Sequence, residues 1–291
     1  MAEFSRVLMV VNPISGGKDK SDIVAEVKKQ VSERNLDLQI YYTSGKGDNE
    51  ALFSVIEEYD PQRIISVGGD GTIKLIAELL TDDSIPIGII PAGSANGLAE
   101  NLNLSGSDSQ LTRIALGEKF SYIDTILIND ELCLHISDIG LNAALIKNYQ
   151  EGNIRGKLGY LIQSIPTLIK SDFPFQFNIE VDGKEISRKA VLIAVANAKK
   201  YGTGSKINPN GRYDDGKFEI LIFKEFNIPQ ILQTFREHVE LDEDFLEIIS
   251  AVETRIYSQK NIPFQIDGEY RGDIQEVTAR ISPVQIKIAV P

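Results

Sequence analysis

The sequence lacks several features that would place it among secreted or membrane-spanning proteins. Its single cysteine, Cys133, excludes an internal disulfide framework and is typical of a protein from a reducing compartment. No apolar run approaches the length that spans a bilayer, and the run at 7–11 is too short for the core of a signal peptide. We therefore expect a cytoplasmic protein.

Basic charge is also in deficit. The chain carries 42 acidic residues against 30 lysines and arginines, which gives a net charge of -12. Nucleic-acid binding without sequence preference depends on basic side chains that neutralise phosphates, and broad adsorption to an anionic membrane has the same requirement. We expect no nucleic-acid partner, and work on membrane lipids would need a local basic or apolar patch.

Motifs for familiar cofactors are missing as well. The two histidines, His135 and His238, have no metal-ligand spacing, so we interpret both as structural, and Cys133 as a small core residue. Neither G-x-x-x-x-G-K-[ST] nor a G-x-G-x-x-G at the first helix occurs. The sequence does not support a standard P-loop or dinucleotide fold.

The length and the hydrophobic pattern indicate two domains, because 291 residues exceed the size at which one core usually keeps growing. In the first 120 or so residues, short apolar strands alternate with helices, which predicts an α/β domain with a parallel sheet covered on both faces. The predicted strands are 6–11, 38–43, 63–67 and 86–90; the predicted helices begin at Ser21 and span 48–59 and 73–80.

From about Phe120 the pattern becomes mostly strand-like, which predicts a β sandwich or barrel. We place the domains at 1–122 and 123–291, with about 280–291 able to pack back onto the first, and a cleft between the two. The predicted strands of the second half are 122–126, 132–136, 175–181, 189–195, 218–223, 251–257, 264–267 and 284–290, and the predicted helices lie near 157–170 and 228–238.

Three loops follow the carboxyl ends of predicted parallel strands, at 12–17, 68–72 and 91–97. Ligands of open α/β sheets bind at that edge. Glycines there let a backbone approach closely, and N–H groups at the start of the following helix favour phosphate oxygens. Together the loops predict a phosphate-binding edge.

The loop 68–72 contains one acid, Asp70, between glycines. An acid at a helix start can cap backbone N–H groups, but Thr72 stands nearer the predicted helix and is the expected cap. A carboxylate that faces bound phosphates needs a cation between them, and Mg²⁺ with oxygen ligands is the natural mediator. We therefore expect phosphoryl transfer, which depends on positioning and charge stabilisation.

The ordered motifs resemble those of the diacylglycerol kinase catalytic-domain family of lipid kinases, which includes sphingosine and ceramide kinases, and the resemblance covers nearly the whole chain. It implies a three-layer α/β domain, related to NAD kinases and phosphofructokinase, then a β-sandwich domain that takes the lipid. The matching segments are 12–16 (N-P-x-S-G), 68–72 (G-G-D-G-T), 91–96 (P-x-G-[ST]-x-N), 140–144 (G-[FL]-D-A), 196–202 with 214–216, and 267–269 (D-G-E).

The resemblance also implies roles for single residues. Glu269 corresponds to a general base, and Asp70 to a residue that holds the catalytic Mg²⁺ or acts on the nucleophile. Asp215, with backbone oxygens of Arg212 and Lys217, corresponds to a structural Mg²⁺ site, and Asp124 to a carboxylate of the cleft. The implied ATP-binding residues are Asn12, Pro13, Ser15, Gly16, Thr43, Gly68, Gly69, Gly71, Thr72, Ser94 and Asn96.

Simpler interpretations stay open for some of these residues. Asp267 and Gly268 also form an ordinary hairpin turn, after which Glu269 would be a solvated charge. The sequence departs from the family pattern at Gly97 and Asn142, where many members have an acid. Helical spacing of apolar residues in 158–169 suits either an acyl pocket or a helix that packs on its own core, and Phe173–Phe175 suits core or membrane contact.

The expected activity is transfer of the ATP γ-phosphoryl group to the hydroxyl of a lipid, either diacylglycerol or a sphingoid lipid. Such an enzyme would bind a membrane surface transiently, and the sequence leaves open whether it is a homodimer. Two alternatives remain: a kinase with a soluble acceptor, as in NAD kinases, and a non-catalytic nucleotide-binding regulator.

Overall fold

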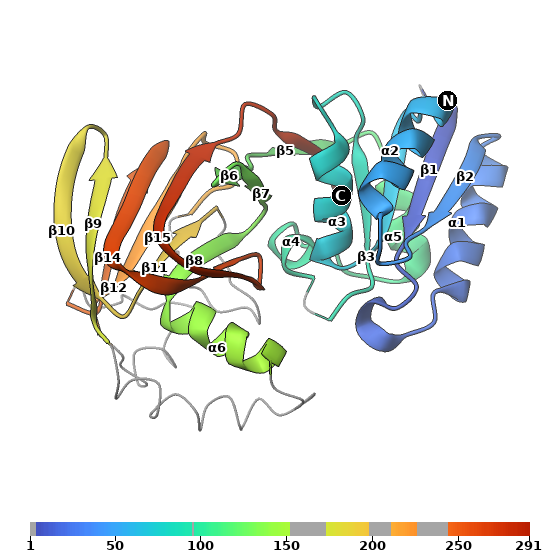
Figure 1. Ribbon diagram of the computed structural model, residues 1–291. Coiled ribbons are helices and arrows are strands. Elements are labelled where there is room, and N and C mark those ends of the chain that lie inside the picture. Colours follow the sequence, from blue (N-terminus) through green and yellow to red (C-terminus); the bar gives the residue numbers. More distant parts are fainter. Residues whose placement is uncertain (1–3, 95, 152–172, 198–210, 226–243) are drawn as a thin grey trace. The chain divides into compact units, whose positions relative to one another are not determined.

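The computed structural model describes residues 4–94, 96–151, 173–197, 211–225 and 244–291 (Figure 1). The chain divides into two compact units, one made of residues 1–124 with 283–291 and the other of residues 125–282. The predicted helices near 157–170 and 228–238 lie outside the described residues, as do His238 and the segment 201–202. Among the described residues, no helix combines the length and the apolar character needed to cross a membrane.

The first unit is built on a six-stranded sheet with the order β2-β1-β3-β4-β16-β5. All neighbours pair in parallel except β16 and β5, which are antiparallel. The central strands are buried because helices cover both faces of such a sheet. The strands are β1 (Arg6–Val11), β2 (Asp37–Tyr42), β3 (Arg63–Gly68), β4 (Ile87–Pro91), β5 (Phe120–Ile123) and β16 (Ile286–Ala289).

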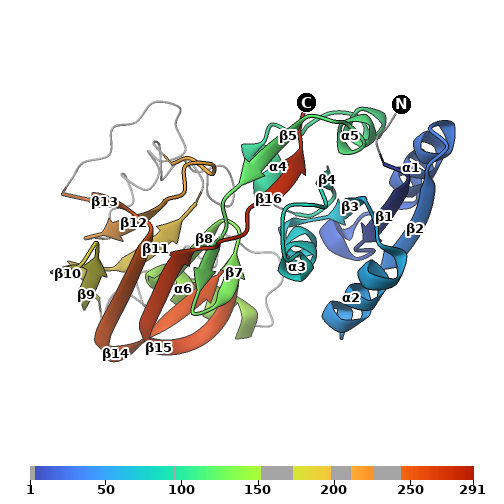
Figure 2. The ribbon, with the colours of Figure 1, turned by 90° about the horizontal axis from the view of Figure 1, so that it is seen from above.

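Helices cover this sheet in two pairs. Helix α1 contacts α5, and α2 contacts α3, and the two pairs lie on opposite faces (Figure 2). This arrangement follows from right-handed crossovers between parallel strands. The α/β prediction is confirmed. The helices are α1 (Ser21–Glu33), α2 (Asp48–Tyr59), α3 (Asp70–Leu79), α4 (Gly97–Asn101) and α5 (Asp108–Ala115), with a short 3-10 helix at Ser15–Gly17.

The second unit contains a ten-stranded sheet with the main order β13-β12-β11-β8-β14-β15-β6-β7. Strand β14 (Glu253–Ile266) shares one edge between two partners: its residues 254–257 pair with β9 and 264–266 with β8. The sheet therefore folds over, and apolar side chains of its strands form two core clusters. The other strands are β6 (Ile126–Ile128), β7 (Glu131–Cys133), β8 (Ile136–Gly140), β9 (Phe175–Val181), β10 (Lys184–Ala190), β11 (Leu192–Ala196), β12 (Phe218–Phe223), β13 (Leu246–Ala251) and β15 (Glu269–Ile281).

Several predicted boundaries of the second half are wrong. The predicted strand 122–126 is two strands, β5 and β6, that belong to different units. The predicted strands 251–257 and 264–267 are parts of the single strand β14. The predicted strand 284–290 is present as β16 (Ile286–Ala289), in the sheet of the first unit, to which the sequence had allowed residues of about 280–291 to return. Helix α6 (Leu141–Glu151) follows β8 directly and was not expected.

Candidate active site

The three glycine-rich loops of the first unit interlock at one edge of its sheet. They follow β1, β3 and β4, which are neighbours and parallel. The Asn12 N–H donates to the Val67 carbonyl at 2.9 Å, and the Ala92 N–H donates to the Gly68 carbonyl at 2.7 Å. The Ser15 hydroxyl donates to the Ala92 carbonyl at 3.0 Å. The predicted meeting of the loops at this edge is confirmed.

Gly16 and Gly93 have no room for a side chain because the backbone of a neighbouring loop lies against them. A Cβ on Gly93 would lie 2.5 Å from the Cα of Gly69. Gly16 adopts a φ of +60°, and a Cβ there would lie 2.6 Å from the Ala92 carbonyl oxygen. By contrast, a Cβ on Gly71 would meet nothing within 4 Å. The glycines thus serve two purposes, close loop packing at Gly16 and Gly93 and open space at Gly71.

Asp70 caps a helix, but not the helix that it begins. Its Oδ2 accepts from the Gly97 N–H at 2.7 Å and its Oδ1 from the Leu98 N–H at 3.1 Å, both at the start of α4. Helix α3 has Gly69 as its N-cap and no side-chain cap. The expectation that Thr72 caps α3 is therefore wrong. The carboxylate of Asp70 holds the loop 68–72 against the start of α4.

Thr72 instead presents a buried hydroxyl beside the strand end. Its side chain is 3% exposed, and its Oγ1 has no hydrogen-bond partner among the described residues. A Cβ on Gly68 would lie 2.2 Å from this oxygen, so only glycine fits there. A buried hydroxyl without a partner costs free energy, and a ligand oxygen beside it would remove that cost.

The remaining predicted ATP-binding residues lie at the same edge. Asn96, with a φ of +54°, closes its loop because its side chain accepts from the Gly93 N–H at 2.8 Å and donates to the Gly93 carbonyl at 3.0 Å. Pro13 and Ser94 are exposed, and Thr43 follows β2, its N–H donating to the Val11 carbonyl at 2.9 Å.

A lysine that the sequence did not single out fixes the first loop. Lys20 is 4% exposed, and its Nζ donates to the carbonyls of Ser15 and Lys18, both at 2.6 Å. It lines a cavity of about 390 Å³ with Val11, Pro13, Val24 and Tyr42 among the other lining residues. No short motif contains a buried lysine that binds carbonyls, so this residue gave no signal in the sequence.

In the second unit, Glu269 begins β15 directly after a tight turn. The turn residues Asp267 and Gly268 have φ values of +49° and +85°, as a two-residue hairpin turn between right-twisted strands requires. The hairpin interpretation is confirmed. The Glu269 side chain is 63% exposed and pairs with the Arg271 Nη1 at 2.8 Å; Arg271 in turn binds Glu131 on β7.

Asp267 ties this turn to the segment between β7 and β8. Its Oδ2 accepts from the Leu134 N–H at 3.0 Å and its Oδ1 from the His135 N–H at 2.9 Å. Its own N–H donates to the Ile136 carbonyl at 2.9 Å. The acid of the D-G-E motif is therefore an anchor that fixes where the turn begins.

A second acid, Asp138, lies buried behind the same turn. It accepts hydrogen bonds from Asn142, Gln265 and the Ala143 N–H. Burial raises the pKa of Asp138 to about 6, and the three hydrogen bonds oppose that rise. No ion pair to Asp138 is found in the part of the chain that the structure describes. The sequence gave no indication of this residue, because its partners are brought to it by the fold.

Of the residues expected to hold metal, Asp124 belongs to the first unit, and Arg212, Asp215 and Lys217 belong to the second. Asp124 is buried, and its Oδ1 accepts from the Gln285 Nε2 at 2.7 Å. Asp215 is exposed in the turn before β12 and accepts from the Lys217 N–H at 3.2 Å, while Arg212 pairs with Asp214 at 3.1 Å. No group of three or more acidic, histidine or cysteine side chains suited to a metal ion occurs among the described residues.

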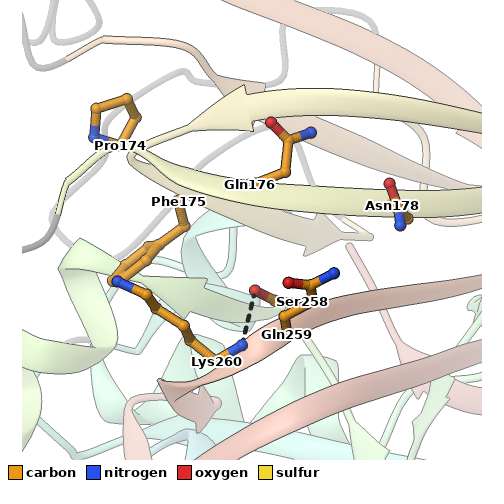
Figure 3. A pocket seen from close by; sticks show the side chains of 7 residues that line it. All are labelled: Pro174, Phe175, Gln176, Asn178, Ser258, Gln259 and Lys260. Carbon is orange, nitrogen blue, oxygen red and sulfur yellow. Dashed lines mark hydrogen bonds between the residues drawn. The ribbon is translucent and has the colours of Figure 1, made fainter.

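A pocket of about 320 Å³ lies in the second unit, where β9 separates from β14 (Figure 3). Two of its amide side chains have partners, since Gln176 donates to the Arg188 carbonyl at 3.3 Å and Asn178 accepts from the Ser187 hydroxyl. Phe175 is buried and packs edge-on against Phe173, which favours the core interpretation of these aromatics. The pocket presents no evident catalytic group.

Comparison with known proteins agrees with this geometry. Residues 6–128 match the diacylglycerol kinase catalytic domain, and residues 137–290 match the YegS C-terminal NAD kinase beta sandwich-like domain. The chain therefore belongs to the diacylglycerol kinase catalytic-domain family of lipid kinases.

Individual relatives span almost the full length. A protein of Staphylococcus haemolyticus named "Putative lipid kinase" is 27% identical, over 98% of this chain and 94% of its own. A crystal structure described as a "putative diacylglycerol kinase" from Bacillus anthracis superposes with a TM-score of 0.83 at 22% identity, covering 100% of this chain and 98% of that one. The structure of an NAD kinase from Archaeoglobus fulgidus in complex with ATP gives a TM-score of 0.54 at 16% identity. The match covers 97% of this chain and 93% of that one. The structural comparisons confirm the fold.

Proposed function

We propose that this protein is an ATP- and Mg²⁺-dependent lipid kinase that phosphorylates the hydroxyl of diacylglycerol or a sphingoid lipid. The observation that carries the proposal is the interlocked edge of the first unit, where backbone hydrogen bonds and the Ser15 hydroxyl hold the loops 12–17, 68–72 and 91–97 together. Glycines at such an edge let phosphate groups come close to the backbone, so the edge suits a nucleoside triphosphate.

The edge has features that fit ATP phosphates. Gly71 is exposed and has open space around it, and the Thr72 hydroxyl is buried beside it without a partner among the described residues. Both belong to the first turn of α3, whose N-terminus favours negative charge. Lys20 keeps the loop 12–17 in place through the Ser15 carbonyl.

The carboxylates fit a role beside a divalent cation. Each oxygen of Asp70 accepts one N–H from α4, and carboxylate oxygens are common ligands of Mg²⁺ in proteins. Asp70 would hold the catalytic Mg²⁺, Asp215 with the backbone oxygens of Arg212 and Lys217 the structural one, and Asp124 is a further carboxylate candidate. Bound Mg²⁺ would offset the negative charge that develops on the phosphates.

In the proposed reaction, Glu269 accepts the proton of the lipid hydroxyl. The hydroxyl oxygen of the lipid bonds to the γ-phosphorus of ATP, and ADP departs. The side chain of Glu269 is 63% exposed, so an acceptor could reach it from solvent, and the ion pair with Arg271 on the same face of β15 would orient it.

Labelled ATP provides the test. Purified protein is incubated with γ-labelled ATP and Mg²⁺ and with diacylglycerol, sphingosine or ceramide in mixed micelles, or with NAD in solution. Label in one of the lipids, lost on chelation of Mg²⁺, is the expected result. Label in NAD alone would overturn the lipid assignment, and ATP binding without transfer to any acceptor would favour a regulator.

A further inference from the structure

Asp138 is a buried acid outside every motif that identifies the family. It lies on β8, is 3% exposed, and all three of its hydrogen-bond partners are donors. Its Oδ1 accepts from the Ala143 N–H at 2.9 Å, and its Oδ2 accepts from Asn142 Nδ2 and Gln265 Nε2, each at 2.5 Å. Among side chains of this size only a carboxylate can accept in both directions, so Asp138 determines which way the two amides face.

The orientation of Gln265 has a consequence for the turn before Glu269. Gln265 is fully buried on β14. Because its Nε2 faces Asp138, its Oε1 points the other way and accepts from the Gly268 N–H at 2.7 Å. Gly268 immediately precedes Glu269. The chain of contacts therefore runs from the buried carboxylate through one amide to the backbone that carries Glu269.

We propose that Asp138 is a positioning residue, which orients Gln265 so that its amide oxygen holds the Gly268 N–H and thereby sets the direction of Glu269. The proposal rests on the proposed function of Glu269 as the base. Asp138 itself touches neither substrate nor ATP in this scheme and acts only through Gln265.

The same contacts account for the departure at Asn142. An acid at this position would bring a second carboxylate against the Asp138 oxygen that now lies 2.5 Å from the amide nitrogen. Two carboxylates cannot both ionise readily at such a distance when one of them is buried. The amide at 142 and the acid at 138 are therefore a matched pair, and Asn142 is not a sign of lost activity.

An exchange of the two side chains separates positioning from structural support. In Asp138→Asn, a side-chain N–H opposes another donor whichever way the new amide faces. The double variant Asp138→Asn/Asn142→Asp restores a donor and an acceptor between 138 and 142. In this variant the side-chain amide introduced at position 138 also donates an N–H toward Gln265. Gln265 must then turn its Oε1 toward residue 138, and this oxygen no longer accepts from the Gly268 N–H. A structural role predicts that stability and activity recover together, whereas a positioning role predicts that only stability recovers.

The measurements are the denaturation midpoint, kcat and KM for ATP and lipid, and hydrogen exchange of peptides that cover 264–271, with Asp130→Asn as the control on an exposed acid. We expect Asp138→Asn to lower kcat about tenfold or more, to leave KM for ATP within about twofold, and to raise exchange at the turn. The double variant should regain the midpoint but keep the low kcat and fast exchange.

Wild-type kcat in Asp138→Asn, or joint recovery of midpoint and kcat in the double variant, would overturn the proposal. If Asp138→Asn does not fold, Gln265→Met removes the link to Gly268 and leaves the Asp138 contacts to α6, with the same loss of kcat expected. A wild-type protein that phosphorylates no lipid would remove the proposed function instead. Hydrogen exchange of the peptides that cover 264–271 would still show whether Asp138 holds the turn.

Discussion

The carboxylate of Asp70 accepts the backbone N–H of Gly97, 27 residues further along the chain, at 2.7 Å. Gly97 contributes its backbone N–H to this contact. The contact joins the loop after β3 to the helix after β4. One acid thus supports the structure of the edge at which we propose that ATP binds.

This double use predicts two separable effects of Asp70→Asn. The amide can replace only one of the two accepted hydrogen bonds, so we expect a loss of about 1 kcal/mol in the free energy of unfolding. We expect a fall in kcat of about a hundredfold or more, because the charge is also lost from the site. Urea denaturation and the lipid assay measure the two effects, with Asp82→Asn in an exposed turn as the control. Full activity in Asp70→Asn would rule out its role in the reaction.

Alanine at two glycines should separate packing from phosphate binding. Gly93→Ala places a Cβ 2.5 Å from Gly69 Cα, so the backbone must shift, and we expect a destabilisation of about 1–3 kcal/mol. Gly71→Ala meets no atom within 4 Å and lies in the first turn of α3, so stability should stay constant or rise by up to about 1 kcal/mol.

ATP affinity distinguishes the two variants from each other. Gly71→Ala should weaken ATP binding although the protein is at least as stable, because its methyl group occupies the space proposed for phosphate oxygens. Isothermal titration with ATP and Mg²⁺ gives the affinity. Unchanged affinity in Gly71→Ala would place the phosphates elsewhere.

Lys20→Met should loosen the loop 12–17. The variant keeps the apolar stem but loses two charge-assisted hydrogen bonds at 2.6 Å, which corresponds to about 1.5–3 kcal/mol in unfolding free energy. KM for ATP should rise, because the Ser15 carbonyl is no longer held. Lys29→Met, on the exposed side of α1, is the matched control and should change neither quantity. Equal effects of both variants would mean that only net charge matters.

The acid Asp138 should make stability depend on pH. Its pKa is raised to about 6 in the folded protein, so its ionisation is less favourable there than in the unfolded chain. The contribution of Asp138 to the free energy of unfolding is therefore largest below about pH 4. It falls as the pH rises from there through 6, by about 3 kcal/mol in total. Urea unfolding of wild type and Asp138→Asn between pH 4.5 and 7.5 measures the difference, which should narrow toward high pH. A constant difference would contradict the raised pKa.

The sequence predicted the first unit well, because its strands and helices have distinct periods and end at glycine-rich loops. It failed where the decisive partner is remote. The acceptor role of Asp70 depends on α4, which has too few residues to show a helical period. Likewise, Asp138 meets Gln265 across 127 residues, and neither residue belongs to a recognisable motif. The polar residues of 258–261 interrupt the apolar pattern of β14, which made one strand look like two.

The place of β16 has a consequence for how the protein is made. This strand pairs with β4 and β5, so the sheet of the N-terminal unit is incomplete until residues 286–289 have left the ribosome. At about 5–20 residues per second, the stretch from the end of β5 to β16 takes roughly ten to thirty seconds to synthesise. During that time the edges of β4 and β5 that pair with β16 have no partner strand, while residues 125–282 can already fold. We infer that the unit that begins the chain is the last to be completed.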